Sequence, residues 1–555
     1  MIVVRTKKIK DLAVGRYISL KKIHNVVFVV MCFGLFACNS ENKASLSANS
    51  IIYCSEGAPE VFNPQLVTSG VTIDATSKQL YNQLITFDAK NNSISPSLAK
   101  SWHVTRDNKK ITFYLKKNVN FHQTDFFIPT RTLNADDVIF SFNRILDENN
   151  VFHQVSGGRY PFFQSVGFSD LIQSIERIND YTIRFTLNRA DSSFLANLAT
   201  DFAVILSKEY AEQLVKQGQM ENIDFHPIGT GPFKLKEYRA GTFIRYNPHE
   251  QYWGNKTTLK QLVFDITPSN TGRLTKLLAG ECDIVAYPIA HEKIAQNPKL
   301  ALNDVTAFNI GYLGFNTAKY PFDNKTVRKA VAHAIDRQAI LDTVYFGDAK
   351  AEAATTILPP SSWAYDETIP VIEYSVDKAK QLLVESGHPN GFTIDLWAMP
   401  VQRAYNPDAV TMAKLIQADL QKIGITVNII SFNWQEFLRR VALGEHHAVL
   451  LGWSADHPDP DNFFTPLLSC ASAETGSNRT FWCDQSFDDI IQRSLLTTDI
   501  KERKVLYHQA LHIAAEELPL LPIAHSKRFQ ARSTKIKGPL LNAFGGIDFN
   551  GVSKN

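Results

Sequence analysis

The sequence predicts an α/β fold with two lobes and a cleft that can close by hinge motion. The chain has 555 residues, 44% of them apolar, which is enough to bury more than one core. Its second half alternates amphipathic helices with short strands, the pattern of an α/β domain. A strand-like run from Leu518 to near Arg532 follows the last helix and could return the chain to the first lobe, making more than one crossover.

The first 38 residues read as a secretory signal. A basic leader precedes the apolar run from Val26 to Ala37, which is too short to span a bilayer comfortably. The run ends in "LFAC", which resembles the bacterial lipobox, although Phe36 is bulkier than that pattern prefers. We therefore expect lipidation at Cys38, with ordinary cleavage and free release as the alternative. Residues 39–50 then form a flexible tether.

Charge and cysteine content restrict the class of protein further. After the leader, acidic side chains slightly outnumber basic ones, and no Lys/Arg-rich block remains, so a nucleic-acid partner is not expected. Four cysteines follow the leader, an even number that predicts two disulfides in an oxidising compartment. Zinc is the rival, but no CxxC or Cys/His cluster appears. The local pair is Cys470 with Cys483, which leaves Cys54 and Cys282 for a long-range bond.

The first part of the mature chain predicts a mixed region. "IIYCSEGAPEVFNPQ" begins as a short strand and runs into a turn-rich loop. Alternating apolar positions predict strands in "NKKITFYLKKNVNFH" and "NDYTIRFTLNR". "NADDVIFSFNRIL" has an Asn or Asp cap before apolar residues at helical spacing, which predicts an amphipathic helix.

The second part changes character. "NKTVRKAVAHAIDRQAILDTVY" and "DAVTMAKLIQADLQKIGI" are predicted helices, and the strand "TVNIIS" follows the latter. The last predicted helix is "KERKVLYHQALHIAAEE", directly before the returning strand.

The stretch "VLLGWSADHPDPDNFF" places three carboxylates close to the end of an apolar strand. The spacing does not suit a calcium loop, because prolines occupy positions that need oxygen ligands. Asp459 precedes Pro460 and is expected to cap a helix over about 461–468. Asp456 has no local partner, so beside Trp453 it is either a turn-former or a receptor for a cation.

A second polar centre lies in "LWAMPVQRAYNP", where a strand runs into a loop that carries Arg403. Arginine presents a planar fork of donors that suits a carboxylate, although surface arginines are common. Paired with Asp456, it suits a zwitterion such as a peptide. We take the candidate ligand-binding residues to be Asp456, Arg403, Trp453, Tyr405, Met399 and Trp434.

The chain lacks the motifs of common hydrolases and metal sites. No GxSxG, HExxH, SxxK or phosphate-binding loop is present, and "IGTGPF" reads as a turn. His446 and His447 are adjacent, so they point in different directions and a surface or core position is favoured over a metal site. We expect no enzyme activity, no metal and no cofactor. A secreted hydrolase is the alternative class, and it would need a nucleophile with its base.

Matches to one family run along nearly all of residues 51–552. The matching segments are "YCSEGAPEVFNPQL", "PIGTGPFKL", "YWGNK", "GECDIVAYP", "GDAKAEAATTILPPSSWAYD", "WAMPVQRAYNP", "GWSADHPDPDNFF" and "GSNRTFWC". By these segments the chain resembles the peptide-binding proteins of bacterial ABC importers, in the SapA-like and dipeptide-binding (DppA-like) branch of the family 5 solute-binding proteins.

The resemblance implies a two-lobed type II periplasmic binding protein fold with a hinged cleft. One lobe comprises 51–308 plus 527–555, with an inserted subdomain at about 80–225, and the other comprises 309–526. In dipeptide-binding members the position of Asp456 holds the ligand's α-ammonium and that of Arg403 its α-carboxylate. The disulfides of that branch fall on the two cysteine pairs above.

The resemblance also implies partners and a place of work. A monomer in the periplasm of a Gram-negative bacterium, held to a membrane by its lipid, would deliver short peptides to an ABC permease and ATPase complex in the inner membrane. SapA-like members are associated with antimicrobial-peptide resistance and haem handling. "TGRLTKLLAGECD", "ILPPSSWAYD", "EELPLLPIAHS" and "GPLLNAFGGIDFNGV" resemble the SapA-like branch, so we expect a SapA-like protein with a short-peptide site. The alternative is a dipeptide- or haem-binding lipoprotein of a Dpp-type importer.

Overall fold

The computed structural model describes residues 49–88, 93–347 and 350–555, which belong to one compact unit. The predicted signal segment, the lipidation site Cys38 and nearly all of the predicted tether lie outside the described residues. Within the described ranges, no helix has the length and apolar content that crossing a membrane requires.

One large sheet runs through the unit. Its strand order is β16-β15-β17-β13-β18-β11-β1-β10-β9-β8, and β12 and β14 also pair with β18. In chain order these strands are β1 (Ser50–Ser55), β8 (Phe233–Arg239), β9 (Phe243–Pro248), β10 (Gln261–Ile266), β11 (Ile284–Ala286), β12 (Leu300–Thr306), β13 (Asn309–Phe315), β14 (Ala351–Ala353), β15 (Thr393–Ala398), β16 (Thr426–Ile430), β17 (Ala448–Ser454) and β18 (Leu520–Ser533).

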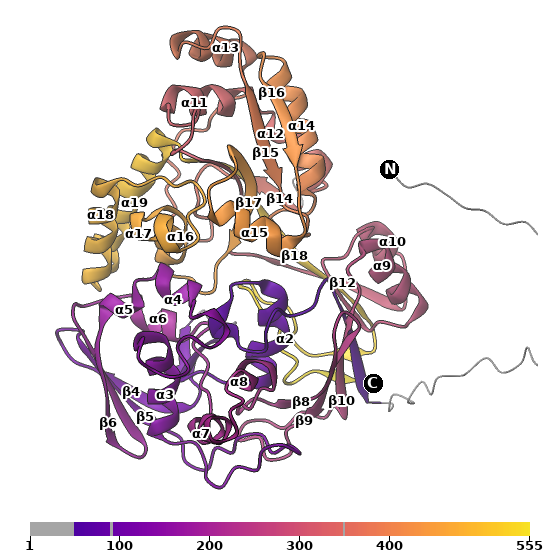
Figure 1. Cartoon of the computed structure of the whole chain (residues 1–555). Helices are drawn as coiled ribbons and strands as arrows, with labels where there is room; N and C mark the ends of the chain where they lie inside the picture. Colours follow the sequence, from indigo (N-terminus) through magenta and orange to yellow (C-terminus); the bar gives the residue numbers. More distant parts are fainter. Residues whose placement is uncertain (1–48, 89–92, 348–349) are drawn as a thin grey trace, which may run out of the picture. The chain divides into compact units, whose positions relative to one another are not determined.

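Strand β18 connects the two parts of this sheet. Its beginning pairs with β13, up to Ala524 opposite Gly311, and its end pairs with β12, from Lys527 opposite Thr306. In Figure 1 this strand passes between the orange elements and the region of β12. The strand-like run predicted after the last helix is therefore confirmed as a strand, and it ends one residue beyond the predicted Arg532.

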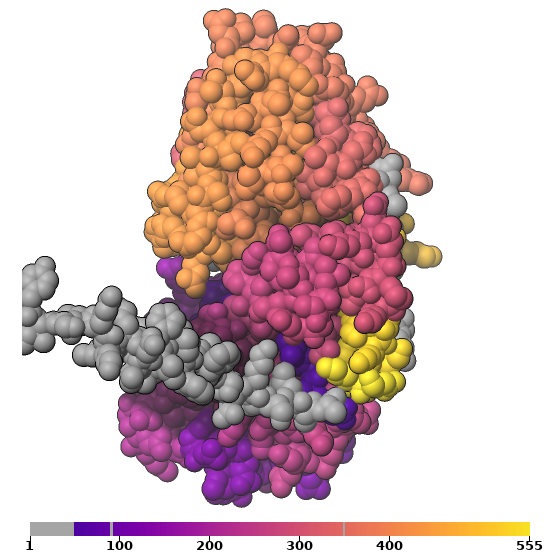
Figure 2. Space-filling model, turned by 90° about the vertical axis from the view of Figure 1, so that its right-hand side faces the viewer, coloured from indigo at the N-terminus to yellow at the C-terminus, as the bar shows by residue number. Residues whose placement is uncertain are grey.

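Two large hydrophobic cores lie on either side of this crossover. The first core is built from residues between Ile51 and Ala286 together with residues between Ile536 and Val552. The second core is built from residues between Phe308 and Ala524, with Phe544 added. Figure 2 shows the same division: the orange segments gather at one end, and the yellow C-terminal residues lie with the indigo-to-magenta segments.

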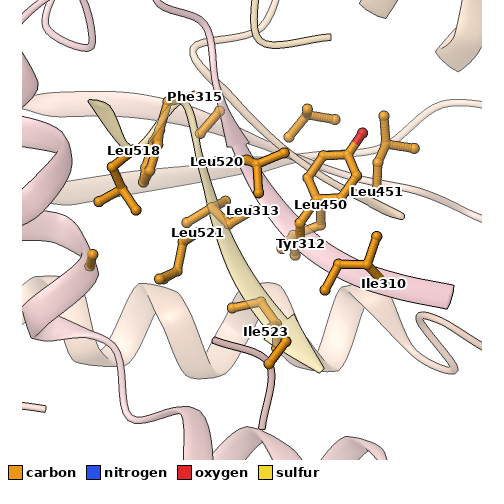
Figure 3. Close-up of a cluster of buried hydrophobic side chains, with 14 of the residues drawn as sticks. Ile310, Tyr312, Leu313, Phe315, Leu450, Leu451, Leu518, Leu520, Leu521 and Ile523 are labelled. Atoms are coloured by element: carbon orange, nitrogen blue, oxygen red, sulfur yellow. The ribbon is translucent and has the colours of Figure 1, made fainter. Parts of the chain in front are cut away.

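The second core is densest where β13, β17 and β18 meet. Figure 3 shows side chains from all three strands, together with Leu518, gathered where these strands lie side by side. The strands are paired in antiparallel registers, with Leu313 opposite both Leu450 and Leu521. Because both faces of these central strands are covered, they are apolar almost throughout rather than alternating.

Smaller sheets and helices complete the unit. A four-stranded sheet has the order β4-β5-β7-β6, and two hairpin-like pairs are β2-β3 and β19-β20. These strands are β2 (Ile85–Asp88), β3 (Ser93–Pro96), β4 (Ala99–Val104), β5 (Lys110–Leu115), β6 (Ile172–Asn179), β7 (Thr182–Leu187), β19 (Ile536–Lys537) and β20 (Ser553–Lys554). The helices are α2 (Gly70–Leu80), α3 (Ala135–Leu146), α4 (Pro161–Ser165), α5 (Phe168–Leu171), α6 (Phe194–Leu198), α7 (Lys208–Gln217), α8 (Asn222–Phe225), α9 (Asn270–Ala279), α10 (His291–Ala295), α11 (Lys325–Ala334), α12 (Arg337–Val344), α13 (Val376–Glu385), α14 (Ala409–Gln421), α15 (Trp434–Ala442), α16 (Asp461–Leu468), α17 (Cys470–Thr475), α18 (Gln485–Leu496) and α19 (Ile500–Glu517).

Most predicted elements are confirmed, and one is corrected. Helix α3 begins with a capping box in which Asn134 and Asp137 bond each other's backbone, as its polar start predicts. The segment "NKTVRKAVAHAIDRQAILDTVY" is two helices, α11 and α12, rather than one. The break falls at Ile335, which is extended, and Asp336 then caps α12 by accepting a hydrogen bond from the Ala339 N–H at 3.0 Å.

The turn predicted for "IGTGPF" is confirmed, and its glycines have a packing reason. A Cβ at Gly229 or Gly231 would collide with the backbone at the end of α2, around Leu80. The glycines thus allow the chain to pass close to α2 before β8 begins.

Candidate functional site

A cavity of about 170 Å³ lies between the two cores. The first core contributes residues such as Ile73 of α2 and Phe202, and the second contributes residues such as Tyr312 and Leu451. Five of the six predicted ligand-binding residues line it, namely Arg403, Tyr405, Trp434, Trp453 and Asp456. The structure thus brings together positions that are distant in the sequence.

Met399 is the predicted ligand-binding residue that does not line the cavity. It directly follows β15 and is buried in the second core. Its apolar side chain supports the strand end from which the Arg403 loop departs. Among the described residues, no group of three or more His, Cys, Asp or Glu is placed to hold a metal ion.

Asp456 lies just beyond the end of β17, with its backbone fixed and one carboxylate oxygen unsatisfied. Its N–H donates to Asn462 Oδ1 at 2.9 Å, and the Trp453 indole N–H donates to the same oxygen at 3.2 Å. Oδ2 of Asp456 is buried and accepts no hydrogen bond. Burial raises the pKa of Asp456 to about 8; the nearby Asp201 adds to the shift and the bond to Asn462 opposes it.

The loop that carries Arg403 is seated on glycines of the central strands. A Cβ at Gly452 of β17 would meet the Tyr405 ring, and one at Gly311 of β13 would meet the Tyr405 carbonyl oxygen. The Tyr345 hydroxyl donates to that same carbonyl oxygen at 2.6 Å. Glycine at these two positions therefore lets the loop approach the sheet closely.

Arg403 forms an ion pair that joins the two cores. Its Nη1 donates to Glu56 Oε1 at 3.0 Å and to the Gln402 carbonyl oxygen at 2.8 Å. The side chains of Arg403 and Glu56 are only 6% and 5% exposed. Burial by itself would lower the pKa of Arg403, but Glu56 and the other acidic groups around it, Tyr287, Tyr405 and Asp74, together outweigh burial and the pKa rises.

Sequence reasoning missed Glu56 as a partner of Arg403. We expected a ligand alone to compensate Arg403, whereas the structure supplies a carboxylate from a segment 347 residues away. Glu56 comes directly after β1 in "YCSEG", one of the segments that carries the family resemblance. An acidic side chain at the end of a buried strand was the available signal.

Two donors at the cavity remain unpaired beside the Glu56–Arg403 ion pair. Arg403 Nη2 and Trp434 Nε1 are both buried without a hydrogen-bond partner. The Arg403 guanidinium lies 5.8 Å from the centre of the Trp434 ring. Among the fully buried polar atoms of the described cavity lining, Asp456 therefore has one unsatisfied acceptor, and Arg403 and Trp434 each have one unsatisfied donor. Such groups are stable in an interior only when a partner arrives.

Asp459 has a larger role than the expected cap. Helix α16 spans Asp461–Leu468 as predicted, but Pro460 rather than Asp459 occupies its N-cap position. Asp459 lies one residue before the cap, and its Oδ1 accepts a hydrogen bond from the Asp461 N–H at 3.0 Å. Its carboxylate also receives both terminal nitrogens of Arg503, at 2.8 and 2.9 Å, and so joins α16 to α19. Sequence reasoning could not find this partner, because Arg503 lies 44 residues further along the chain.

The described cysteines form two disulfides. Cys54 is bonded to Cys282 with their Cα atoms 5.9 Å apart, and Cys470 is bonded to Cys483 with their Cα atoms 4.5 Å apart. These pairings are the ones that the local spacing and the resemblance indicate. The second bond closes a loop from which Ser477 reaches the cavity.

Comparison with known proteins gives one consistent family. Residues 93–475 match the model of bacterial extracellular solute-binding proteins, family 5 middle region. The chain is 44% identical over 512 residues to the dipeptide-binding protein of Escherichia coli, covering 92% of this chain and 95% of the relative. It is 42% identical to haem-binding protein A of Haemophilus influenzae, covering 93% and 94%. It is 40% identical to the peptide transport periplasmic protein SapA of Salmonella typhimurium, covering 92% and 93%.

A solved structure agrees with these relatives. The dipeptide-binding protein of Pseudoalteromonas sp. SM9913, in complex with Met-Leu, is 46% identical and has a TM-score of 0.89. The similarity covers 91% of this chain and 100% of that one.

Proposed function

The chain belongs to the bacterial extracellular solute-binding proteins of family 5 and has their two-lobed α/β fold. We propose that it captures short peptides in the cavity between its lobes. It then delivers them to an ABC permease and ATPase complex in the inner membrane. In this proposal the protein is a monomer that works in the periplasm of a Gram-negative bacterium.

The observation that carries the proposal is the pair of buried side-chain atoms at the cavity, one on Asp456 and one on Arg403, that lack hydrogen-bond partners. The buried Oδ2 of Asp456 needs a donor, and the buried Nη2 of Arg403 needs an acceptor. A peptide has a cationic amine at one end and an anionic carboxylate at the other, so one molecule satisfies both. Trp434 Nε1 is a further donor for the peptide backbone. The relative that was solved with Met-Leu supports this class of ligand.

Haem is the second candidate ligand, supported by the relative named haem-binding protein A. The cavity volume of about 170 Å³ argues against it. Sites for drug-sized ligands usually have about 300–1,000 Å³. A short peptide therefore fits the cavity better than haem, and an absorbance titration with haem separates the two.

Titration calorimetry with dialanine tests the peptide site. Replacing Asp456→Ala should weaken dialanine by roughly thirtyfold to several thousandfold, because losing one partner of a buried charged pair costs about 2–5 kcal/mol. Acetylating the amine of the peptide should weaken binding to the wild type comparably but add little in the variant, since both changes remove the same contact.

The proposed contact between Arg403 and the C-terminal carboxylate of the peptide is tested in the same way. Amidating the peptide should weaken binding to the wild type but add little in Arg403→Ala, whose folding is checked separately because Arg403 also pairs with Glu56. Asp489→Ala, which removes an exposed carboxylate from α18, should leave all affinities unchanged. The proposal fails if Asp456→Ala binds free and acetylated dialanine as tightly as the wild type does.

We propose lobes of 51–308 plus 527–555 and of 309–526, with the subdomain at about 80–225 inserted in the first. The change of partners along β18, between Ala524 and Lys527, supports a boundary there. Limited proteolysis of the empty protein should cut first near these crossovers, and cuts confined to other places would contradict them.

We also propose that Cys38 is lipidated and holds the protein to a membrane. The basic leader, the apolar run and "LFAC" support this. Two or more acyl chains anchor stably, since each buried CH₂ contributes about 0.8 kcal/mol. An intact mass without lipid, or a mature N-terminus elsewhere, would overturn it.

The segments that resemble the SapA-like branch favour a ligand range that includes antimicrobial peptides. The alternative is that the protein belongs to the dipeptide-binding branch. The identities of 40–44% to relatives of the three kinds do not separate these branches. Competition between dialanine and an antimicrobial peptide, measured on the purified protein, distinguishes them.

A further inference from the structure

A third guanidinium, that of Arg479, lines the cavity without a partner. Among the described residues, no hydrogen bond or ion pair reaches its side chain. After burial, the largest influence on the pKa of Arg479 comes from the buried hydroxyl of Tyr312, which lines the same cavity and raises this pKa. Burial lowers the pKa of Arg479 from its ordinary value, the direction expected for a cation that lacks a counterion.

The other two arginines of the cavity have acidic neighbours. Arg403 bonds to Glu56 at 3.0 Å. Arg528 lies close to Asp74. Burial raises the pKa of the Asp74 carboxyl to about 7, and the positive charge of Arg528 opposes this rise. Arg479 has neither arrangement. A half-buried cation of this kind is costly unless something brings negative charge to it.

The segment around Arg479 is held in place at its backbone. The His446 imidazole Nε2 lies 2.9 Å from the Arg479 carbonyl oxygen, and burial lowers the pKa of His446 to about 4, so the neutral ring donates this bond. The Asn478 side chain donates to the carbonyl oxygens of Ser469 and Trp482 at 3.1 and 2.9 Å. The disulfide between Cys470 and Cys483 closes the same loop.

These constraints make the loop a fixed support rather than a flexible surface segment. The backbone beside Arg479 is restrained by hydrogen bonds on both sides and by a covalent bond. The backbone that carries Arg479 is therefore pre-organised, which reduces the entropy that the loop loses when a ligand binds. This arrangement is typical of a residue that contributes to specificity.

We infer that Arg479 binds an anionic side chain of the ligand, so that the cavity prefers short peptides that contain Asp or Glu. The inference rests on the proposed function. The two termini of a peptide occupy Asp456 and Arg403, and the peptide backbone then offers no further charge for Arg479. A side-chain carboxylate is the remaining group of a short peptide that can pair with it.

Calorimetry with matched dipeptides tests the inference. The probes are Ala-Ala, Ala-Glu, Glu-Ala and the uncharged isosteres Ala-Gln and Gln-Ala. The wild type should bind at least one Glu peptide about tenfold or more tighter than its Gln isostere, the range expected for a hydrogen bond to a charged group. Arg479→Gln should remove this preference while changing the affinity for Ala-Ala less than about threefold, because Ala-Ala does not use Arg479.

Controls separate a binding role from a structural one. Arg493→Gln removes an exposed arginine of α18 and should keep the preference. Thermal unfolding shows whether Arg479→Gln is folded, and Arg479→Lys, which retains the charge, should keep part of the preference.

Each outcome has a distinct meaning. Equal affinity for the Glu and Gln peptides overturns the inference while leaving the proposed function intact. If Arg479→Gln weakens every peptide that has a free carboxylate but not the amides, Arg479 binds the C-terminus and the inference is wrong. Failure of Ala-Ala and all the other probes to bind the wild type overturns both.

Discussion

Asp456 is the residue whose protonation state is most directly linked to ligand binding. Its pKa of about 8 in the empty cavity means that the carboxyl is mostly protonated at pH 7. A ligand ammonium favours the carboxylate, so binding below pH 8 should release a proton, and affinity should rise as pH increases from about 5 to 8. Calorimetry in buffers of different ionisation enthalpy measures this release. Asp456→Asn should show none, and release that persists in this variant would assign it to another group.

The same carboxyl affects the stability of the empty protein. The pKa of Asp456 is raised above its value of about 3.9 in an unfolded chain, so the folded state binds more protons between about pH 4 and 8. Stability should therefore fall as pH rises through this window. Asp456→Asn removes this pH-dependent contribution. Its free energy of unfolding, measured by chemical denaturation, should therefore equal that of the wild type near pH 4 and exceed it increasingly toward pH 8. An advantage that does not change with pH would contradict the shift.

Two charged residues of the cavity, Asp456 and Arg403, could be predicted from the sequence, but the others and the partner of Arg403 could not. Asp456 and Arg403 each follow an apolar strand, and that local pattern marks them as candidates. Glu56 meets Arg403 across 347 residues of chain, which only the three-dimensional fold reveals. Arg479 belongs to "GSNRTFWC", which carried the resemblance, but its lack of a counterion is visible only when all neighbours are known.

At the scale of elements, the Asp459–Arg503 pair should determine how firmly α16 is attached to α19. The side chains are 13% and 5% exposed. Asp459→Ala leaves a buried arginine without its partner, which typically costs about 3–5 kcal/mol. This exceeds the roughly 1 kcal/mol expected for a lost helix cap. Urea unfolding of the variant measures the difference.

A cap elsewhere in the same lobe provides the matched control. Asp484 caps α18 by accepting a hydrogen bond from the Phe487 N–H at 2.9 Å, and it forms no ion pair with a described residue. Asp484→Ala should therefore lower the free energy of unfolding by about 1 kcal/mol. Equal losses at Asp459 and Asp484 would mean that the ion pair adds nothing to the cap.

The disulfide between Cys470 and Cys483 should stabilise the fold as well as the cavity loop. The double variant with serine at both positions should lose about 3 kcal/mol of unfolding free energy, the chain-entropy estimate for a loop of this size. The same variant should weaken any preference for Glu peptides, since the loop carries Arg479. A stability equal to that of the wild type would show that the hydrogen bonds of Asn478 hold the loop alone.

Elements were predictable where their signals are local. The cap of α3 and the apolar period of α14 mark both helices in the sequence. The break between α11 and α12 was not predictable from apolar spacing, because the apolar pattern continues through Ile335. Asp336 was the available signal, since a cap residue inside a helical pattern can also start a new helix.

At the scale of the whole molecule, the α/β class and the return of the last strand were predictable, but the sheet order was not. The alternation of apolar strands and amphipathic helices along the chain can be recognised from the sequence pattern. Which strands become neighbours depends on distant pairings. For example, β1 lies beside β10 and β11, and both of these strands follow β1 by more than two hundred residues. Sequence pattern carries little information on such distant pairing, because any of several apolar strands would fit.

The ion pair between Glu56 and Arg403 bridges the two cores and should therefore control closure of the empty protein. Both side chains are almost fully buried. Glu56→Gln removes the negative partner, and Arg403 then stays buried in the closed form without a counterion. Such a loss costs about 3–5 kcal/mol, enough to shift the closed–open equilibrium toward the open form by more than about hundredfold.

Small-angle scattering can measure this shift, because an open form has a larger radius of gyration. The empty Glu56→Gln variant should be larger than the empty wild type, and saturating dialanine should return it to the size of the liganded wild type. Glu237→Gln breaks ion pairs confined to the first lobe, with Arg239 and Arg245, and should leave the radius unchanged. If Glu56→Gln and the wild type have the same radius when empty, the pair does not control closure. If the variant stays larger even with dialanine bound, the ligand carboxylate does not replace Glu56 as the partner of Arg403.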